Sequence, residues 1–340
     1  MMRSFCRTMI TIFFLIAVGI APGNADPLAI TPFYTSNQSP LIQIYGLPWA
    51  ESALTQSSGH TWSLLALDIA NNFASHRNSR EEITLDGESA RVTVALRHGI
   101  SDRLEIGMDI PLMDYNGGIF DGFIEEWHSF FGLPKGKRAD GPHDRLLFSY
   151  EKEGRQRLRL EESKIGIGDI RLSGGWQLYQ SGSSNPLAVA LRASLKLPTG
   201  SSAKLHGSGS TDLALWLTGS DDHLLPGRWG HLTLFLAGGG MAMTEGKVLK
   251  DQQRNLVGFG NLGFGWSPAK WIALKAQVSS HTPFYQGSDL SELGDFAIQL
   301  LIGGTCAFTS RTALDIALSE DLSVATSPDV ALHLGLSHQF

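Results

Sequence analysis

Apolar and polar residues alternate with a period of two along most of the chain, from Trp62 to its end. In residues 186–197, leucine, valine and alanine occupy the odd positions, and the even positions include Arg192 and Lys196. Such alternation is typical of β-strands that are apolar on one face. Most runs are close to the ~9–11 residues with which a tilted strand crosses a bilayer. The predicted strands are 62–73, 89–99, 103–112, 166–179, 186–197, 210–219, 229–242, 255–267, 270–281, 295–306, 311–319 and 329–340.

The connections between these runs alternate in length, which predicts a barrel with a defined direction. Short turns at 100–102, 180–185, 267–270 and 309–310 follow every second strand, and the connection at 220–228 is longer than the others on that side. Outer-membrane barrels have short periplasmic turns and long outer loops. The longer connections are 74–88, 113–165, 198–209, 243–254, 282–294 and 320–328.

The last run, residues 329–340, ends on the aromatic residue Phe340 with no polar tail. A closed barrel ends in this way because its last strand pairs with its first. We therefore expect this run to pair with the strand beginning near Trp62, and we expect Leu336 and Phe340 to form a membrane-insertion signal. The alternative is the closing strand of a β-sandwich, which gives no reason for the alternating connections.

The beginning of the chain has the features of an export signal. Arg3 and Arg7 precede an apolar run at 9–20, and small residues before Asp26 suit cleavage. We therefore expect residues 1–25 to be a signal peptide and 62–340 to be the barrel. Residues 26–61 are irregular and rich in Pro, Ser and Gln. Within them, 40–48 contains a short strand-like piece that we place in the barrel mouth.

The composition argues against spanning helices, a nucleic acid partner and an internal disulfide. Hydrophobic residues make up 42% of the chain, yet no run after the leader approaches the ~18 apolar residues of a spanning helix. The formal net charge is −6 and no basic stripe occurs, which argues against a nucleic acid partner. With Cys6 in the leader, Cys306 is the only remaining thiol, so no internal disulfide is expected.

If the apolar positions face lipid, their neighbours line the lumen. Charges of both signs occur there, which indicates either a constriction that sorts solutes by charge or a salt-bridged interior that stiffens the barrel. The candidate lumen residues are Arg97, Glu105, Asp109, Asp169, Arg171, Arg192, Lys196, Lys275, Asp315 and His333, with Arg91, Asp212 and Gln299 also inward-facing.

The long insert 113–165 contains an amphipathic stretch that predicts a short helix near 119–131. Its apolar stripe is formed by Phe120, Phe123, Ile124, Trp127 and Phe131. We expect this helix to be a lid or plug at the outer mouth, and the alternative is a position on the membrane surface. Farther on, residues 146–150 and 157–160 predict a hairpin above the membrane.

The sequence contains only weak matches to known catalytic and cofactor-binding motifs. The glycine pattern at 258–263 matches a dinucleotide fingerprint, but it lies inside a predicted strand and lacks the following helix. Glu125 and His128 supply only half of a metal site. His206 with Ser208 or Ser210 could form a lipid-hydrolase pair in a long loop. We predict no enzyme, no cofactor and no metal.

Several short blocks occur in order along the chain: Asn37-Gln-Ser-Pro40, Leu85-Asp-Gly-Glu88, Trp127-His128 with Phe131-Gly-Leu-Pro134, Gly166-Ile-Gly-Asp-Ile170, Leu195-Lys-Leu-Pro-Thr-Gly200 and Gly207-Ser-Gly-Ser210. Together they resemble the bacterial family called domain of unknown function 3187. The resemblance implies a barrel and assigns no activity. The Gly-Asp-Ile and Lys-Leu-Pro-Thr-Gly blocks also resemble a wider group of barrels linked to uptake of hydrophobic or aromatic compounds.

The sequence therefore predicts an all-β, single antiparallel transmembrane barrel of about 12 strands in the outer membrane. The predicted function is a gated or plugged channel for small molecules, apolar ones included. The alternatives are a lipid or lipopolysaccharide hydrolase and a structural or surface-interaction barrel. Expected partners are outer-membrane lipids and lipopolysaccharide, the barrel assembly machinery through the last strand, and a small solute.

Overall fold

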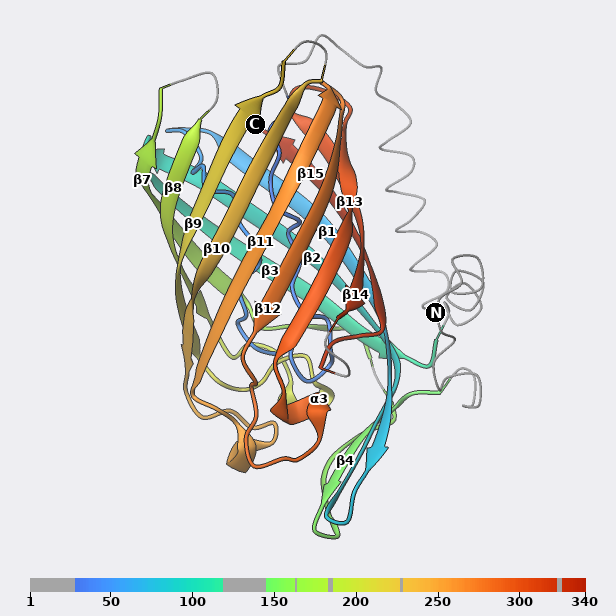
Figure 1. Cartoon of the computed structure of the whole chain (residues 1–340). Coiled ribbons are helices and arrows are strands. Elements are labelled where there is room, and N and C mark those ends of the chain that lie inside the picture. The colour runs from blue at the N-terminus through green and yellow to red at the C-terminus, as the bar shows by residue number, and fades with distance from the viewer. Residues whose placement is uncertain (1–27, 119–144, 163, 183–185, 227–228, 323–325) are drawn as a thin grey trace.

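The computed structural model describes residues 28–118, 145–162, 164–182, 186–226, 229–322 and 326–340. Within them, twelve strands form a closed antiparallel barrel (Figure 1). The last strand pairs with the first, from Trp62 opposite Gln339 to Asn71 opposite Val330. The predicted all-β barrel and its closure are confirmed. Its strands are β1 (Thr61–Arg77), β2 (Glu81–Ser101), β3 (Leu104–Asn116), β7 (Arg171–Gln180), β8 (Leu187–Lys196), β9 (Asp212–Leu224), β10 (His231–Met243), β11 (Leu256–Ala269), β12 (Ile272–His281), β13 (Ala297–Ala307), β14 (Thr312–Asp321) and β15 (Val330–Gln339).

The remaining elements are short. A hairpin of β4 and β5 pairs with the far part of β2 and projects beyond the barrel (Figure 1). The predicted hairpin at 146–150 and 157–160 therefore exists, but the predicted loop 74–88 is wrong. Its residues extend β1 and β2, because Ile83 and Leu85 pair with Tyr150 and Phe148 of β4 and are buried there. The short elements are β4 (Leu147–Lys152), β5 (Arg155–Leu160), β6 (Gly166–Ile167), η2 (Ser202–Lys204), η3 (Lys250–Gln252) and α3 (Ser291–Gly294).

The two ends of the barrel differ, and we name them by their connections. The short-turn end carries the turns after β2, β7, β9, β11 and β13 together with Phe340, and it lies at the top of Figure 1. The long-loop end carries the other connections. The predicted turn at 220–228 is too long, because β9 continues to Leu224, opposite His231. Asp222 holds this extension by accepting hydrogen bonds from Thr233 (2.6 Å) and pairing with His231 (2.8 Å).

The wall has an apolar outer face and a filled inner face. On β9, Leu213, Leu215 and Leu217 are exposed, whereas Ala214 and Trp216 between them are buried. Exposed aromatic side chains gather toward the short-turn end, as in the aromatic girdles of membrane barrels. They are Trp176, Tyr179, Trp229, Trp271 and Phe340.

Two further predictions of local structure are wrong. The run 166–179 is interrupted between β6 and β7, because Asp169 turns inward to bind Lys196. Residues 40–44 form consecutive turns, and none of the residues 40–48 lies in a strand. The Asn37 carboxamide oxygen accepts a hydrogen bond from the Ser39 amide (2.9 Å) and begins these turns. The glycines of 258–263 lie within β11, as predicted.

Two predictions lie outside the described residues: the signal peptide at 1–25 and the helix near 119–131 with its stripe Phe120, Phe123, Ile124, Trp127 and Phe131. In the part of the chain that is described, no helix has the length and apolar composition needed to span a bilayer.

Candidate functional site

Residues 28–60, which we call the plug, run through the lumen to the long-loop end and back (Figure 1). Leu28 and Ile30 pack on Ala273 near the short-turn end, where the segment enters. The amide of Gln56 donates to Glu105 (2.7 Å) near the same end, where the segment returns. Apart from an isolated bridge between Ser58 and Gly99, the plug adds no strand to the described sheet. It fills the barrel without becoming part of its wall.

The tip of the plug closes the long-loop end. Leu41 and Tyr45 belong to a large apolar cluster that includes residues of β2, β4, β9, β10 and β11. The Tyr45 ring stacks on Phe284 with 4.9 Å between centroids. The Tyr285 hydroxyl donates to the Leu41 carbonyl (3.0 Å). Leu41 is fully buried and Tyr45 is 2% exposed, so the tip is packed against several strands of the wall.

A buried ionic cluster holds the returning leg. Glu51 accepts from Arg97 of β2 (2.8 Å) and from Arg192 of β8 (2.6 Å). Arg97 also pairs with Asp109 (2.7 Å), and Arg192 with Glu105 (2.8 Å). All five side chains are at most 5% exposed. We call these five residues the Glu51 cluster.

Trp49 lies two residues earlier on the same leg, between two arginines. The guanidinium carbon of Arg91 is 5.4 Å from a Trp49 ring centroid, and that of Arg171 is 5.1 Å away. Arg171 also donates to the Leu47 carbonyl (2.9 Å). Distances below about 6 Å are those of cation–π contacts.

The other side of the lumen holds the entering leg with fewer charges. Lys275 of β12 pairs with Asp315 of β14 (2.9 Å) and donates to the Thr31 carbonyl (3.0 Å). Its ammonium lies 4.0 Å from the Phe33 ring centroid. On β15, His333 pairs with Asp68 of β1 (2.7 Å), which also accepts from Thr35 of the plug (2.8 Å).

A third polar cluster lies beside the tip, around Lys196. This ammonium pairs with Asp169 (2.6 Å) and Asp212 (3.2 Å) and donates to Ser208 (2.6 Å). Asp212 also accepts from the amide of Gly46 in the plug (2.7 Å). The cluster thus connects the long-loop connection 198–209 to the plug.

The serines of the predicted hydrolase pair are buried in that cluster. Ser208 and Ser210 are fully buried and contact each other (2.7 Å). His206 stacks on Tyr115, with 6.0 Å between ring centroids, and burial lowers its pKa. Among the described residues, no hydrogen bond joins His206 to either serine side chain. His206 is therefore not placed to act as a base for either serine, and both hydroxyls are buried.

The ten candidate lumen residues all point inward. Nine are buried, and the Asp315 side chain is 16% exposed. The sequence did not identify the plug residues that several of them contact, Tyr34, Trp49 and Glu51. No group of three or more His, Cys, Asp or Glu that could hold a metal occurs in the described ranges. Cys306, on β13, forms no disulfide with a described residue.

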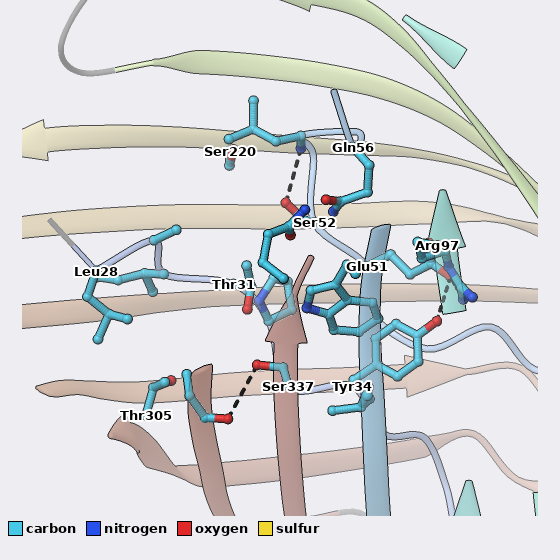
Figure 2. A pocket seen from close by; sticks show the side chains of 18 of the residues that line it. Leu28, Thr31, Tyr34, Glu51, Ser52, Gln56, Arg97, Ser220, Thr305 and Ser337 are labelled. Carbon is cyan, nitrogen blue, oxygen red and sulfur yellow. Dashed lines mark hydrogen bonds and ion pairs between the residues drawn. The ribbon is translucent and has the colours of Figure 1, made fainter. Parts of the chain in front are cut away.

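A cavity of about 700 Å³ lies between the two legs of the plug and the short-turn end (Figure 2). Its rim includes Lys270 and Ser310 from the turns, so it opens at that end. Its inner part is lined by Glu51, Arg97 and Arg192. Hydroxyl groups line much of the rest, among them Thr31, Ser52, Ser220, Thr305 and Ser337.

Comparison with solved structures finds outer-membrane barrels. The COG4313 outer membrane channel from Pseudomonas putida F1 is 13% identical, with a TM-score of 0.53 over 85% of this chain and 98% of that one. The translocator domain of autotransporter NalP from Neisseria meningitidis is 9% identical, with a TM-score of 0.40 over 84% and 90%. The Pseudomonas putida toluene transporter TodX is 10% identical, with a TM-score of 0.35 over 91% and 94%. Only the first is similar enough to support the fold.

Comparison with curated protein sequences gives no match. The model of the family "Protein of unknown function (DUF3187)" matches residues 8–340, which is nearly the whole chain. The resemblance predicted from the short sequence blocks is thereby confirmed: this chain belongs to the DUF3187 family.

Proposed function

We propose that this protein is an outer-membrane channel closed by its own N-terminal plug and opened to small molecules when the plug is displaced. The observation that carries this proposal is the path of residues 28–60, which occupy the lumen and are held there by side-chain contacts rather than by strand pairing. Such contacts can be exchanged for water without breaking the barrel wall. The cavity of about 700 Å³ supplies space for a solute on one side of the plug.

The outer surface supports the membrane location that we propose. The exposed leucines of β9 and the aromatic residues near the short-turn end fit the apolar band and girdle of a barrel in lipid. We place the short-turn end in the periplasm and the long loops outside, where they would meet lipopolysaccharide. We also propose that the barrel assembly machinery recognises the last strand through Leu336 and Phe340.

Conductance measurements test the proposal directly. One variant keeps residues 1–27 and 58–340 and so removes nearly all of the plug. In planar bilayers, we expect this variant to conduct steadily and the intact chain to open only briefly. The matched control is Glu161→Gln, at an exposed side chain that pairs with Arg159 and has no contact with the plug, and it should leave conductance unchanged. No conductance from a correctly assembled plug-deletion variant would refute the proposal.

A surface-interaction barrel is the second candidate, and the projecting sheet of β1, β2, β4 and β5 favours it. If the protein is a surface-interaction barrel, removing the hairpin should abolish the binding of ligands to intact cells that carry the protein. Removing the plug should then have no effect on transport. We propose no enzymatic activity, because the only serine–histidine pair suggested by the sequence is buried and unconnected.

A further inference from the structure

Two buried arginines beside Trp49 have no carboxylate partner in the part of the chain that the structure describes. Arg91 is 5% exposed and Arg171 is 4% exposed. Neither side chain forms a salt bridge with a described residue. The Nε atom of Arg91 is buried without a hydrogen-bond acceptor. Leaving a buried cation unpaired is costly, so the indole of Trp49 is part of what stabilises these two groups.

The Glu51 cluster lies next to this pair of arginines. The sequence Trp49-Ala50-Glu51 thus places an aromatic ring and a carboxylate against four arginines of β2, β7 and β8. We call Arg91, Arg97, Arg171 and Arg192, with Glu105 and Asp109, the charged wall. Without Glu51, these six residues carry four cations and two carboxylates, and Asp68 of β1 lies opposite Arg91 in the strand register.

The facing side of the lumen has a different character. Buried inward positions of β12 and β13 are occupied by Gln277, Gln299 and Thr305, and the Lys275–Asp315 pair there is internally neutral. A displaced plug would therefore expose a positive strip opposite a neutral one. Such a lumen attracts anions to one side.

We propose that the channel's solute is a small aromatic carboxylate, which binds where Trp49 and Glu51 lie and thereby favours the displaced plug. This proposal rests on the proposed channel function and names its solute class. Guanidinium groups bind carboxylates through paired hydrogen bonds and stack on planar rings. A solute that binds only the displaced state shifts the equilibrium toward it.

The neighbouring cavity gives such a solute access to the charged wall. Arg97 and Arg192 belong to the Glu51 cluster and also line the inner part of the cavity, so a carboxylate entering from the short-turn end passes Lys270 at the rim and then reaches them. An uncharged aromatic molecule would leave these two arginines without a new acceptor. An anion without an aromatic ring would leave Arg91 and Arg171 without a replacement for the indole.

The test uses the intact chain in planar bilayers with three probes: benzoate, cyclohexanecarboxylate and benzyl alcohol. We expect benzoate to raise the open probability at a concentration about ten-fold lower than cyclohexanecarboxylate, a factor equivalent to about 1.4 kcal/mol. Benzyl alcohol should have no effect. In a salt gradient, the open channel should pass chloride in preference to potassium. Equal potency of the two carboxylates, or opening by benzyl alcohol, would overturn the proposal.

Two substitutions separate the charged wall from the facing side. Arg171→Gln should weaken the benzoate effect about ten-fold, because one of the two stacking cations is lost. Lys275→Gln, which also removes a cation in contact with the plug, should retain the preference for benzoate over cyclohexanecarboxylate. If the plug-deletion variant conducts and benzoate leaves the intact chain unchanged, the solute assignment fails and the channel function stands. If that variant does not conduct, the channel function itself fails.

Discussion

Replacing Glu51 by glutamine should release the plug, because this side chain is the only formal charge in residues 28–60. Its two oxygens lie 2.8 Å from Arg97 and 2.6 Å from Arg192 in a buried setting. Breaking a buried ion pair costs about 3–5 kcal/mol. Glutamine keeps one acceptor and relieves repulsion from Glu105 and Asp109, which reduces the net cost to roughly 2–3 kcal/mol.

That free energy acts on the balance between the docked and the displaced plug. The barrel wall keeps its strand pairing in both states, so the loss weakens docking far more than it weakens the fold. A change of roughly 2–3 kcal/mol corresponds to an increase of roughly 30- to 150-fold in the ratio of displaced to docked plug. Single-channel recording in planar bilayers reports this ratio as the open probability.

A matched substitution controls for the loss of a carboxylate elsewhere. Glu161→Gln removes an exposed partner of Arg159 that has no contact with the plug, and we expect its open probability to equal that of the wild type. Assembly of both variants is checked by heat-modifiable migration in gels. An assembled Glu51→Gln barrel with unchanged or lower open probability would show that the Glu51 cluster does not hold the channel shut.

Three further predictions concern the barrel itself. Deletion of Phe340 should reduce assembly into the outer membrane while export continues, and equal amounts of heat-modifiable protein would count against an insertion signal. Leu217→Arg, on the exposed face near the middle of β9, should lower the free energy of unfolding in lipid by about 2–4 kcal/mol in denaturant titrations. Gly303→Ala should lower it by about 1–3 kcal/mol, because the added carbon would lie 2.0 Å from the Ile316 carbonyl oxygen. Gly258→Ala should leave the free energy of unfolding unchanged, because its added carbon has no neighbour closer than 3.5 Å. An equal decrease in the free energy of unfolding for both variants would contradict the steric argument.

The barrel strands could be predicted because each is governed by a local rule. A lipid-facing strand must alternate, and β8 follows that rule along its length, whereas β3 departs from it only at Gly107 and Met108. The strand extensions beyond the membrane could not be predicted in the same way. Ile83 and Leu85 form strand because β4, more than 60 residues away in sequence, supplies their pairing partners. Such pairing depends on tertiary contacts rather than on a repeating pattern.

The inward direction of the charged residues was also predictable, since it follows from the same alternation. The groups that these charged residues contact could not be predicted. Tyr34 and Trp49 lie on opposite legs of the plug and contact each other, with 4.1 Å between ring centroids, so no repeating pattern in the sequence relates them. One signal was nevertheless present: 33 consecutive residues, 28–60, contain aromatic and aliphatic side chains but a single carboxylate and no lysine or arginine. A solvent-exposed segment of that length would carry more charge.

This scarcity of charge is itself an argument for a movable plug. Neutral hydrogen bonds contribute about 0.5–1.5 kcal/mol each when they replace bonds to water, so exchanging many of them for water changes the free energy only moderately. A plug with ion pairs along both legs would face a large penalty for leaving every wall cation unpaired at once. Here the wall retains Glu105 and Asp109 for Arg97 and Arg192 after Glu51 departs. Because charge is concentrated on the wall and almost absent from the plug, Arg97 and Arg192 each keep a carboxylate partner when the lumen opens.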